Sequence, residues 1–340
     1  MSRIVRFHET GGPDVLRLDD VPDPKPGPGE VLIRTRALGL NRAESMFRLG
    51  QYGVDPVLPS GIGYEAAGVV EAVGDGVDID GVAVGEAVSL VPSFSMVDFG
   101  VHGELVLAPA YAVVAHPEEL TFEQAASLWM MFVTAYGGLI EFAGLREGDT
   151  VLIPAASSSV GLAAIQVAHA VGARAVALTR TSAKRQQLLD VGADAVIATA
   201  EEDVVARVRE LTDGVGARVI FDPVGGTALA GLIEAASAKA VIVLYGLLDR
   251  DPALLDVGAV LFKSLTIRGY ELFETTTDAE RRTAAVAFIR DGLAKGLLTP
   301  VIDRTFPIER IADAHRYLEA GGQVGKIVVT VSGASEGDAS

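Results

Sequence analysis

A serine-rich loop between a strand pattern and a helix pattern is the first segment that could bind a ligand. The apolar run Val151-Leu-Ile-Pro-Ala155 leads into Ala156-Ser-Ser-Ser-Val-Gly161, and a helical pattern follows. Such a loop places the first amides of a helix, and the positive end of its dipole, where they can bind a pyrophosphate. Of the three glycines typical of a dinucleotide-binding loop, only Gly161 is present. An ordinary strand-to-helix turn would have the same pattern. The candidate cofactor ligands here are Ser157, Ser158, Ser159 and Val160.

Basic side chains follow the next strand pattern. The run at 175–178 ends in Thr179-Arg-Thr-Ser-Ala-Lys-Arg185, where NAD-binding proteins normally have an acidic residue for the ribose hydroxyls. Arg180 and Lys184 are spaced so that both could face one phosphate. In a chain of net charge −17, this patch indicates the 2′-phosphate of NADP, although a solvated helix start would have the same composition. The candidate ligands of NADP(H) here are Thr179, Arg180, Thr181 and Lys184.

Strand and helix patterns alternate around these two loops. We expect strands at 150–155, 173–179, 195–198, 219–222, 240–245 and 264–268, and helices at 160–171, 184–191, 202–211 and 229–236. Parallel neighbours need crossover helices, which cover both faces of the sheet. The predicted fold class is therefore α/β, with a doubly wound parallel sheet.

The flanking segments predict a second, mostly β domain. Short apolar runs broken by Gly and Pro fill residues 1–122, and Thr121-Phe-Glu-Gln124 has the spelling of a capping box that starts a long helix to about 144. We expect the nucleotide-binding domain to span 123–268 and the chain to return to the first domain at 269–331. Residues 332–340 are small and polar and are predicted to form a flexible tail.

Composition excludes several classes of function. The chain has no cysteine and only five scattered histidines, so we expect no metal site. The net charge of −17 argues against a nucleic-acid or membrane partner. With no signal-peptide pattern, a cytoplasmic protein is predicted. The apolar helix at 121–144 is predicted to be a core helix.

Taken together, the motifs resemble those of the medium-chain dehydrogenase/reductase superfamily, and within it the zinc-free quinone oxidoreductase (zeta-crystallin-like) branch. The shared landmarks, in the family's order, are Gly39-Leu-Asn-Arg-Ala43, Gly63-Tyr-Glu-Ala-Ala-Gly68, Thr134-Ala-Tyr136, the serine-rich loop, Phe221-Asp-Pro-Val-Gly225 and Lys263-Ser-Leu-Thr-Ile-Arg-Gly269. Zinc-using relatives have a His directly before the Glu of the second landmark, where this chain has Tyr64. The resemblance implies a Rossmann domain and a GroES-like, mostly β catalytic domain.

The resemblance also implies roles for individual residues. Asn41 and Thr134 would lie beside the nicotinamide ribose and its phosphate, and Lys184 would bind the 2′-phosphate. The nicotinamide ring would be bordered by Tyr245, Gly246 and Leu247. Without a metal, hydride transfer relies on positioning and on hydrogen-bond donors. Tyr52, a tyrosine that the family also has, is the preferred donor and Tyr64 the second; either could instead pack against a neighbour, with water as the proton source.

The predicted activity is NADPH-dependent reduction of a quinone or an activated C=C bond in a small-molecule substrate. A zinc-free carbonyl reductase or alcohol dehydrogenase would use the same cofactor site. A non-catalytic NADPH-binding protein is a further alternative, since crystallin-like relatives show that this scaffold can have a structural role. Relatives associate through the last strand of the nucleotide domain, so a homodimer is expected, and the apolar run 240–245 could be the strand that pairs.

Overall fold

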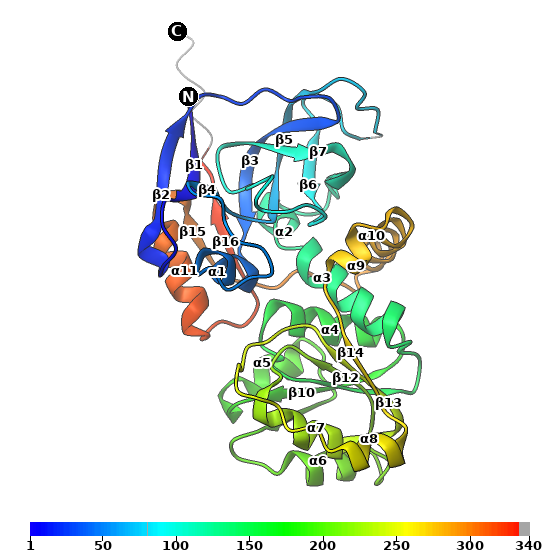
Figure 1. Ribbon diagram of the computed structural model, residues 1–340. Coiled ribbons are helices and arrows are strands. Elements are labelled where there is room, and N and C mark those ends of the chain that lie inside the picture. The colour runs from blue at the N-terminus through cyan, green and yellow to red at the C-terminus, as the bar shows by residue number, and fades with distance from the viewer. Residues whose placement is uncertain (80, 333–340) are drawn as a thin grey trace. The chain divides into compact units, whose positions relative to one another are not determined.

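A computed structural model describes residues 1–79 and 81–332, and the chain divides into two compact units (Figure 1). Unit 1 contains Met1–Met130 and the chain from Pro300 onward, and unit 2 is Met131–Thr299. The return to unit 1 therefore comes later than the predicted position, 269. The cause lies in helix α10 (Ala279–Ala294), where Arg281 pairs with Glu141 at 3.0 Å and the Phe288 ring packs on Tyr136, both partners being in unit 2. Of the predicted tail, 333–340 lies outside the described residues.

Unit 2 contains a six-stranded parallel sheet in the order β11-β10-β9-β12-β13-β14. The order reverses direction between β9 and β12, so the prediction of a doubly wound sheet is confirmed. The strands are β9 (Thr150–Ile153), β10 (Arg174–Thr179), β11 (Ala195–Ala198), β12 (Ala217–Asp222), β13 (Ala236–Leu244) and β14 (Thr266–Gly269).

Helices cover both faces of this sheet. Figure 1 shows α4 on one side of the strands and α6 and α7 on the other. The second side forms a core in which Val208 of α6 and Leu232 of α7 pack with Leu152 and Ile220 of the sheet. The helices are α4 (Ser159–Ala170), α5 (Arg185–Asp190), α6 (Val204–Leu211), α7 (Leu229–Ala235), α8 (Val257–Lys263), α9 (Phe273–Thr276) and α10, with 3₁₀ turns η4 (Ser182–Lys184) and η5 (Gly226–Ala228).

The strand at the edge of the parallel sheet is not the one that was expected to pair with a second copy. Residues 240–245 were expected to form the pairing edge, but β13 is hydrogen-bonded to β12 on one side and to β14 on the other. That prediction is therefore wrong, because the short strand β14 covers the edge of β13 and is itself the sheet's edge.

The predicted helix at 121–144 is divided into shorter segments. The capping box is confirmed, since the Thr121 amide donates to Gln124 Oε1 at 2.9 Å and the Gln124 amide donates to Thr121 Oγ1 at 3.3 Å. The segments are α2 (Phe122–Ala125), α3 (Trp129–Tyr136) and the π-helical turn η3 (Gly137–Phe142). By length and composition Phe122–Phe142 could cross a membrane, but 78% of the tested window is buried within the protein, as in a core helix.

Unit 1 is built on a seven-stranded sheet with β3 at its centre. The path runs β15-β16-β3-β5-β6-β8, and β7 also pairs with β3; a second sheet has the order β2-β1-β4. The strands are β1 (Ser2–Phe7), β2 (Leu16–Val21), β3 (Glu30–Gly39), β4 (Ser60–Gly61), β5 (Glu65–Val73), β6 (Ala87–Leu90), β7 (Leu105–Pro109), β8 (Val113–Ala115), β15 (Ile302–Pro307) and β16 (Lys326–Thr330). The helices are α1 (Arg42–Arg48), α2 and α11 (Ile311–Ala320), with turns η1 (Pro13–Val15), η2 (Ala110–Ala112) and η6 (Ile308–Arg310).

Strand register brings three distant segments of unit 1 to one end of its main sheet. Gly39, the last residue of β3, is opposite Glu65 at the start of β5 and opposite Val328 in the middle of β16. Asn41 follows β3 directly, and Lys326 is the first residue of β16. The fold therefore places Asn41, Glu65 and Lys326 side by side.

Candidate functional site

The serine-rich loop of unit 2 follows β9 at the point where the strand order reverses, which is where open α/β sheets bind ligands. Ser158 caps α4, its Oγ accepting from the Gly161 amide at 3.1 Å. A Cβ on Gly161 would lie 2.6 Å from Ala156 Cα, so a larger residue would push the loop off the helix. The candidate ligands Ser157, Ser158, Ser159 and Val160 are all half-buried, at the end of the helix that favours an anion.

Lys184 connects the loop after β10 with the loop after β9. Its Nζ donates to Ser157 Oγ at 3.1 Å, so one candidate cation already lies on the serine loop. Arg185 instead donates to Val196 O and to Glu202, both at 2.6 Å, and has a structural role beside β11. Arg180 and Thr181 are exposed and Thr179 is half-buried. Of the three predicted basic residues, Lys184 contacts the serine loop, Arg180 is exposed and Arg185 is bound elsewhere.

An acidic residue lies at the same edge of the sheet. The exposed Glu201 follows β11, and its Oε1 accepts from the Ser182 amide at 3.0 Å. Sequence reasoning missed it because it examined the acid position after β10 only. Strands β10 and β11 are parallel neighbours, so the segments after both meet at one edge.

Residues 245–247 follow β13 at the carboxyl edge of the sheet. The Tyr245 ring stacks on Phe221, with centroids 3.9 Å apart, and its buried hydroxyl has no hydrogen-bond partner among the described residues. Burial raises the pKa of this hydroxyl well above its ordinary value. A Cβ on Gly246 would lie 2.8 Å from Pro223 O, whereas Leu247 is exposed. Thr134, the remaining candidate in unit 2, is buried on α3.

In unit 1, Asn41 is the centre of a buried polar cluster that also contains Glu44, Glu65 and Lys326. Asn41 Nδ2 donates to Glu65 Oε2 at 3.0 Å and to Glu44 Oε1 at 3.2 Å, and the Asn41 backbone amide donates to Glu44 Oε2 at 2.5 Å. Lys326 Nζ donates to Asn41 Oδ1 at 2.6 Å and forms a short ion pair with Glu65. All four residues are buried.

Glu44 is a buried carboxyl whose charge depends on pH near neutrality. Burial raises its pKa from 4.5 to about 7, while hydrogen bonds from Asn41 and the charge of Lys326 act in the opposite direction. Two carboxyl groups therefore share one ammonium group within the cluster.

The two candidate tyrosines lie next to this cluster. The Tyr64 amide donates to Glu44 Oε1 at 3.3 Å, and the rings of Tyr64 and Tyr52 have centroids 6.4 Å apart. Burial, and then Tyr52, raise the pKa of the Tyr64 hydroxyl above its ordinary value. Tyr52 contributes through a hydrogen bond between the two hydroxyl groups. The structure thus brings together Asn41, Tyr52 and Tyr64.

Sequence reasoning missed Glu44 and Lys326 as members of this site. For Glu44 a signal was present, since Asn41-Arg-Ala-Glu44 spells a helix start with an acid three residues after the cap. For Lys326 the signal was a charged residue opening an otherwise apolar strand.

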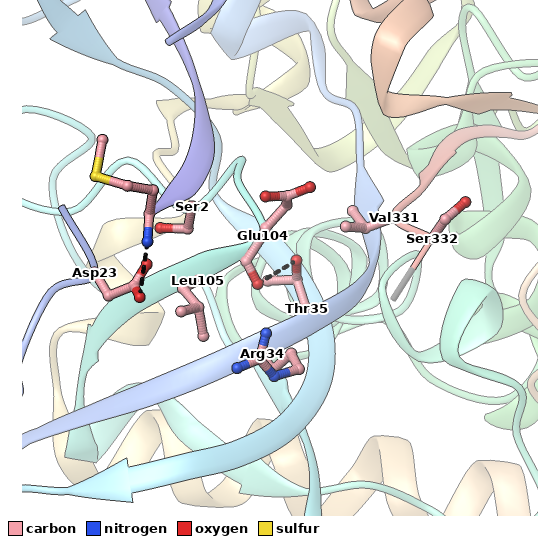
Figure 2. Close-up of a pocket in the computed structure, with 9 residues that line it drawn as sticks. Ser2, Asp23, Arg34, Thr35, Glu104, Leu105, Val331 and Ser332 are labelled. Carbon is pink, nitrogen blue, oxygen red and sulfur yellow. Dashed lines mark hydrogen bonds and ion pairs between the residues drawn. The ribbon is translucent and has the colours of Figure 1, made fainter. Parts of the chain in front are cut away.

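No group of three or more His, Cys, Asp or Glu side chains suited to a metal ion occurs within residues 1–79 and 81–332. Figure 2 shows a separate pocket in unit 1, lined by the N-terminal amine, Asp23, Arg34 and Glu104 among others. The amine pairs with Asp23 at 3.0 Å, and none of the predicted site residues lines this pocket.

Family models and relatives agree with this architecture. Residues 27–118 match the alcohol dehydrogenase GroES-like domain, and residues 159–290 match the zinc-binding dehydrogenase domain. The human quinone oxidoreductase is 31% identical over 331 residues, which cover 97% of this chain and 98% of that protein.

Two solved structures are similar over nearly the whole chain. A mycobacterial protein in complex with NADPH has a TM-score of 0.87 and 33% identity, covering 97% of this chain and 100% of its own. The Escherichia coli quinone oxidoreductase in complex with NADPH has a TM-score of 0.87 and 28% identity, covering 96% and 99%. The predicted combination of Rossmann and GroES-like domains is confirmed, and the chain belongs to the quinone oxidoreductases of the medium-chain dehydrogenase/reductase superfamily, a family of oxidoreductases.

Proposed function

We propose that this protein uses NADPH to reduce a quinone or an activated C=C bond, without zinc. The observation that carries the proposal is the contact of Lys184 with Ser157, which joins a cation to the loop expected to bind the pyrophosphate. The name of the human relative and the NADPH in the two solved structures support the same activity.

The residues of unit 2 suit a dinucleotide. The serine loop and the first amides of α4 would bind the pyrophosphate, and the absence of a side chain at Gly161 lets the loop lie close to the helix. Lys184 and Arg180 would bind the 2′-phosphate, with Thr179 and Thr181 beside them. Tyr245, Gly246, Leu247 and Thr134 would contact the nicotinamide half.

The residues of unit 1 suit hydrogen bonding to the substrate during hydride transfer. When bound, NADPH supplies a hydride. The hydroxyl groups of Tyr52 and Tyr64 are hydrogen-bonded to each other. We assign the donor role in this pair to Tyr64, which leaves the proton of Tyr52 for a ligand. We assign to Tyr52 Oη the role of hydrogen-bond donor to the substrate oxygen that gains negative charge. Asn41 would bind the nicotinamide ribose.

We also propose a cytoplasmic homodimer. The strand β14 is the edge of the parallel sheet, and the neighbouring helix α8 exposes Val257, Leu261 and Phe262, the last to 87%. Among the described residues no strand pairs with the outer edge of β14, and such an edge beside exposed apolar side chains suits association with a second copy. Phe262→Glu should shift the mass measured by sedimentation from dimer to monomer, and an unchanged mass would contradict this interface.

A substrate panel tests the proposed activity. Purified protein with NADPH should turn over quinones or enones faster than aldehydes and ketones. Preference for aldehydes would instead support a carbonyl reductase. Tight NADPH binding with no turnover of any panel member would support a non-catalytic binding protein.

A further inference from the structure

The orientation of the Asn41 carboxamide is determined by its charged neighbours. An ammonium group can only donate hydrogen bonds and an ionised carboxylate can only accept them. Lys326 Nζ lies 2.6 Å from Oδ1 of Asn41, while Glu65 Oε2 lies 3.0 Å from its Nδ2. The flipped amide would place N–H groups against the ammonium and its oxygen against a carboxylate. Lys326 therefore fixes which atom of Asn41 faces which neighbour.

This orientation limits what Asn41 can offer a ligand. Its Nδ2 has two protons and three acceptors within reach, namely Glu65 Oε2 at 3.0 Å, Glu44 Oε1 at 3.2 Å and Gly39 O at 3.3 Å. Its Oδ1 accepts from Lys326 and retains a second lone pair. Toward a ligand, the Asn41 side chain is thus an acceptor, suited to a hydroxyl group and unsuited to a phosphate oxygen.

Lys326 is itself held firmly. Its side chain is fully buried and pairs with Glu65, whose second oxygen accepts from the Met130 amide at 2.8 Å. A Cβ on Gly39 would lie 3.1 Å from Lys326 Cε and 2.0 Å from Ala126 O, so glycine at this position leaves room for the lysine stem. Few alternative positions remain for the ammonium.

We infer that Lys326 is a positioning residue, which holds the Asn41 carboxamide as an acceptor for a hydroxyl group on the nicotinamide ribose. The inference rests on the proposed function, because it assigns Asn41 to that half of NADPH. It adds to the cofactor site a residue of β16, far from Asn41 along the chain.

Matched variants separate this role from simple charge balance. Lys326→Met alone would leave carboxylates buried without their partner, which can prevent folding. Glu65→Gln is therefore the background, and Lys326→Met is added to it. The two proteins differ only in the lysine. Their affinities are measured by fluorescence titration with NADPH and with adenosine 2′,5′-bisphosphate, which lacks the nicotinamide ribose.

We expect the added Lys326→Met change to weaken NADPH binding about tenfold, the loss of roughly one hydrogen bond, with unchanged binding of the bisphosphate. In an Asn41→Ala background the same change should have no further effect, because Lys326 acts through Asn41. Equal NADPH affinity of the two proteins, with and without Lys326, would overturn this inference and leave the proposed function standing.

A measurement on the unmodified protein requires no variant to fold. Of two NADPH analogues, each lacking one hydroxyl of the nicotinamide ribose, one should bind about tenfold more weakly than NADPH. Equal affinity for both analogues and NADPH would overturn the role of Asn41 as an acceptor. Failure of the unmodified protein to bind NADPH at all would overturn the proposed function and this inference with it.

Discussion

Lys184 Nζ donates to Ser157 Oγ at 3.1 Å, so a side chain from the segment after β10 lies on the loop after β9. If these two segments bind the 2′-phosphate and the pyrophosphate, Lys184 is the residue that belongs to both. Several expected outcomes depend on this contact and on the buried cluster of unit 1.

Lys184→Ala or Arg180→Ala should weaken NADPH binding by roughly 1.5–3 kcal/mol, about ten- to a hundredfold in Kd, because each removes a charge-assisted contact with the 2′-phosphate. NADH lacks that phosphate and should be affected little. Titration of each variant with both nucleotides measures the difference. Arg185→Ala is the control, because Arg185 is bound to Val196 O and Glu202. Equal losses for NADPH and NADH would contradict the role of these cations.

Glu201→Gln should strengthen NADPH binding about two- to fivefold relative to NADH, since it removes an exposed like charge near the 2′-phosphate. The glutamine oxygen can still accept from the Ser182 amide, so the loop should keep its conformation. The ratio of the two dissociation constants is the readout. A ratio identical to that of the unmodified protein would show that Glu201 lies outside the phosphate site.

Tyr52→Phe should lower kcat about a hundredfold with little change in NADPH affinity, because it removes the proposed donor to the substrate oxygen. Tyr64→Phe should have a smaller effect, since the proposal assigns to Tyr64 only a hydrogen bond with Tyr52. Stopped-flow oxidation of NADPH measures both. Unchanged kcat in Tyr52→Phe would mean that the stabilising donor, or the proton, comes from water.

Glu44 should make the stability of unit 1 depend on pH. Its pKa is raised from 4.5 to about 7 in the folded protein, so the folded state binds more protons than the unfolded state between these values. The contribution of Glu44 is therefore fully present below about pH 4.5 and lost by about pH 7, a change of about 3 kcal/mol.

The comparison requires Glu44→Gln at each pH. His102 and His315 are buried with lowered pKa values, so their contributions fall as the pH is lowered and oppose that of Glu44. Fluorescence of Trp129, the one tryptophan and a buried residue of unit 1, follows unfolding by denaturant. The free energy of unfolding of the unmodified protein, minus that of Glu44→Gln, should decrease from pH 4.5 to 7. A difference independent of pH would contradict the raised pKa.

The parallel sheet was predictable because its signals are local. Each strand from β9 to β13 is a short apolar run next to a helix pattern, and the periodicity changes at each boundary. Strand β14 was also predicted, at 264–268, but its place at the edge of the sheet was not, because strand order depends on contacts between segments far apart in the sequence. Helix α8 was not predicted, and its apolar residues are exposed.

The cluster around Asn41 could be predicted only in part. Asn41 is at a family landmark, but Lys326 is far away along the chain and reaches it through the pairing of β16 with β3. Which strands pair cannot be predicted from a single sequence, so contacts that depend on the register between strands cannot be predicted from it either. The position where the chain returns to unit 1 was misplaced for a similar reason, since contacts of α10 with Glu141 and Tyr136 decide it.

The most direct test of the central claim is the rate of quinone reduction with NADPH and with NADH, on protein dialysed against a chelator. We predict turnover with NADPH, a higher kcat/KM for NADPH than for NADH, and no change on adding zinc. Absence of NADPH-dependent turnover, or activity that disappears with the chelator and returns with zinc, would contradict it.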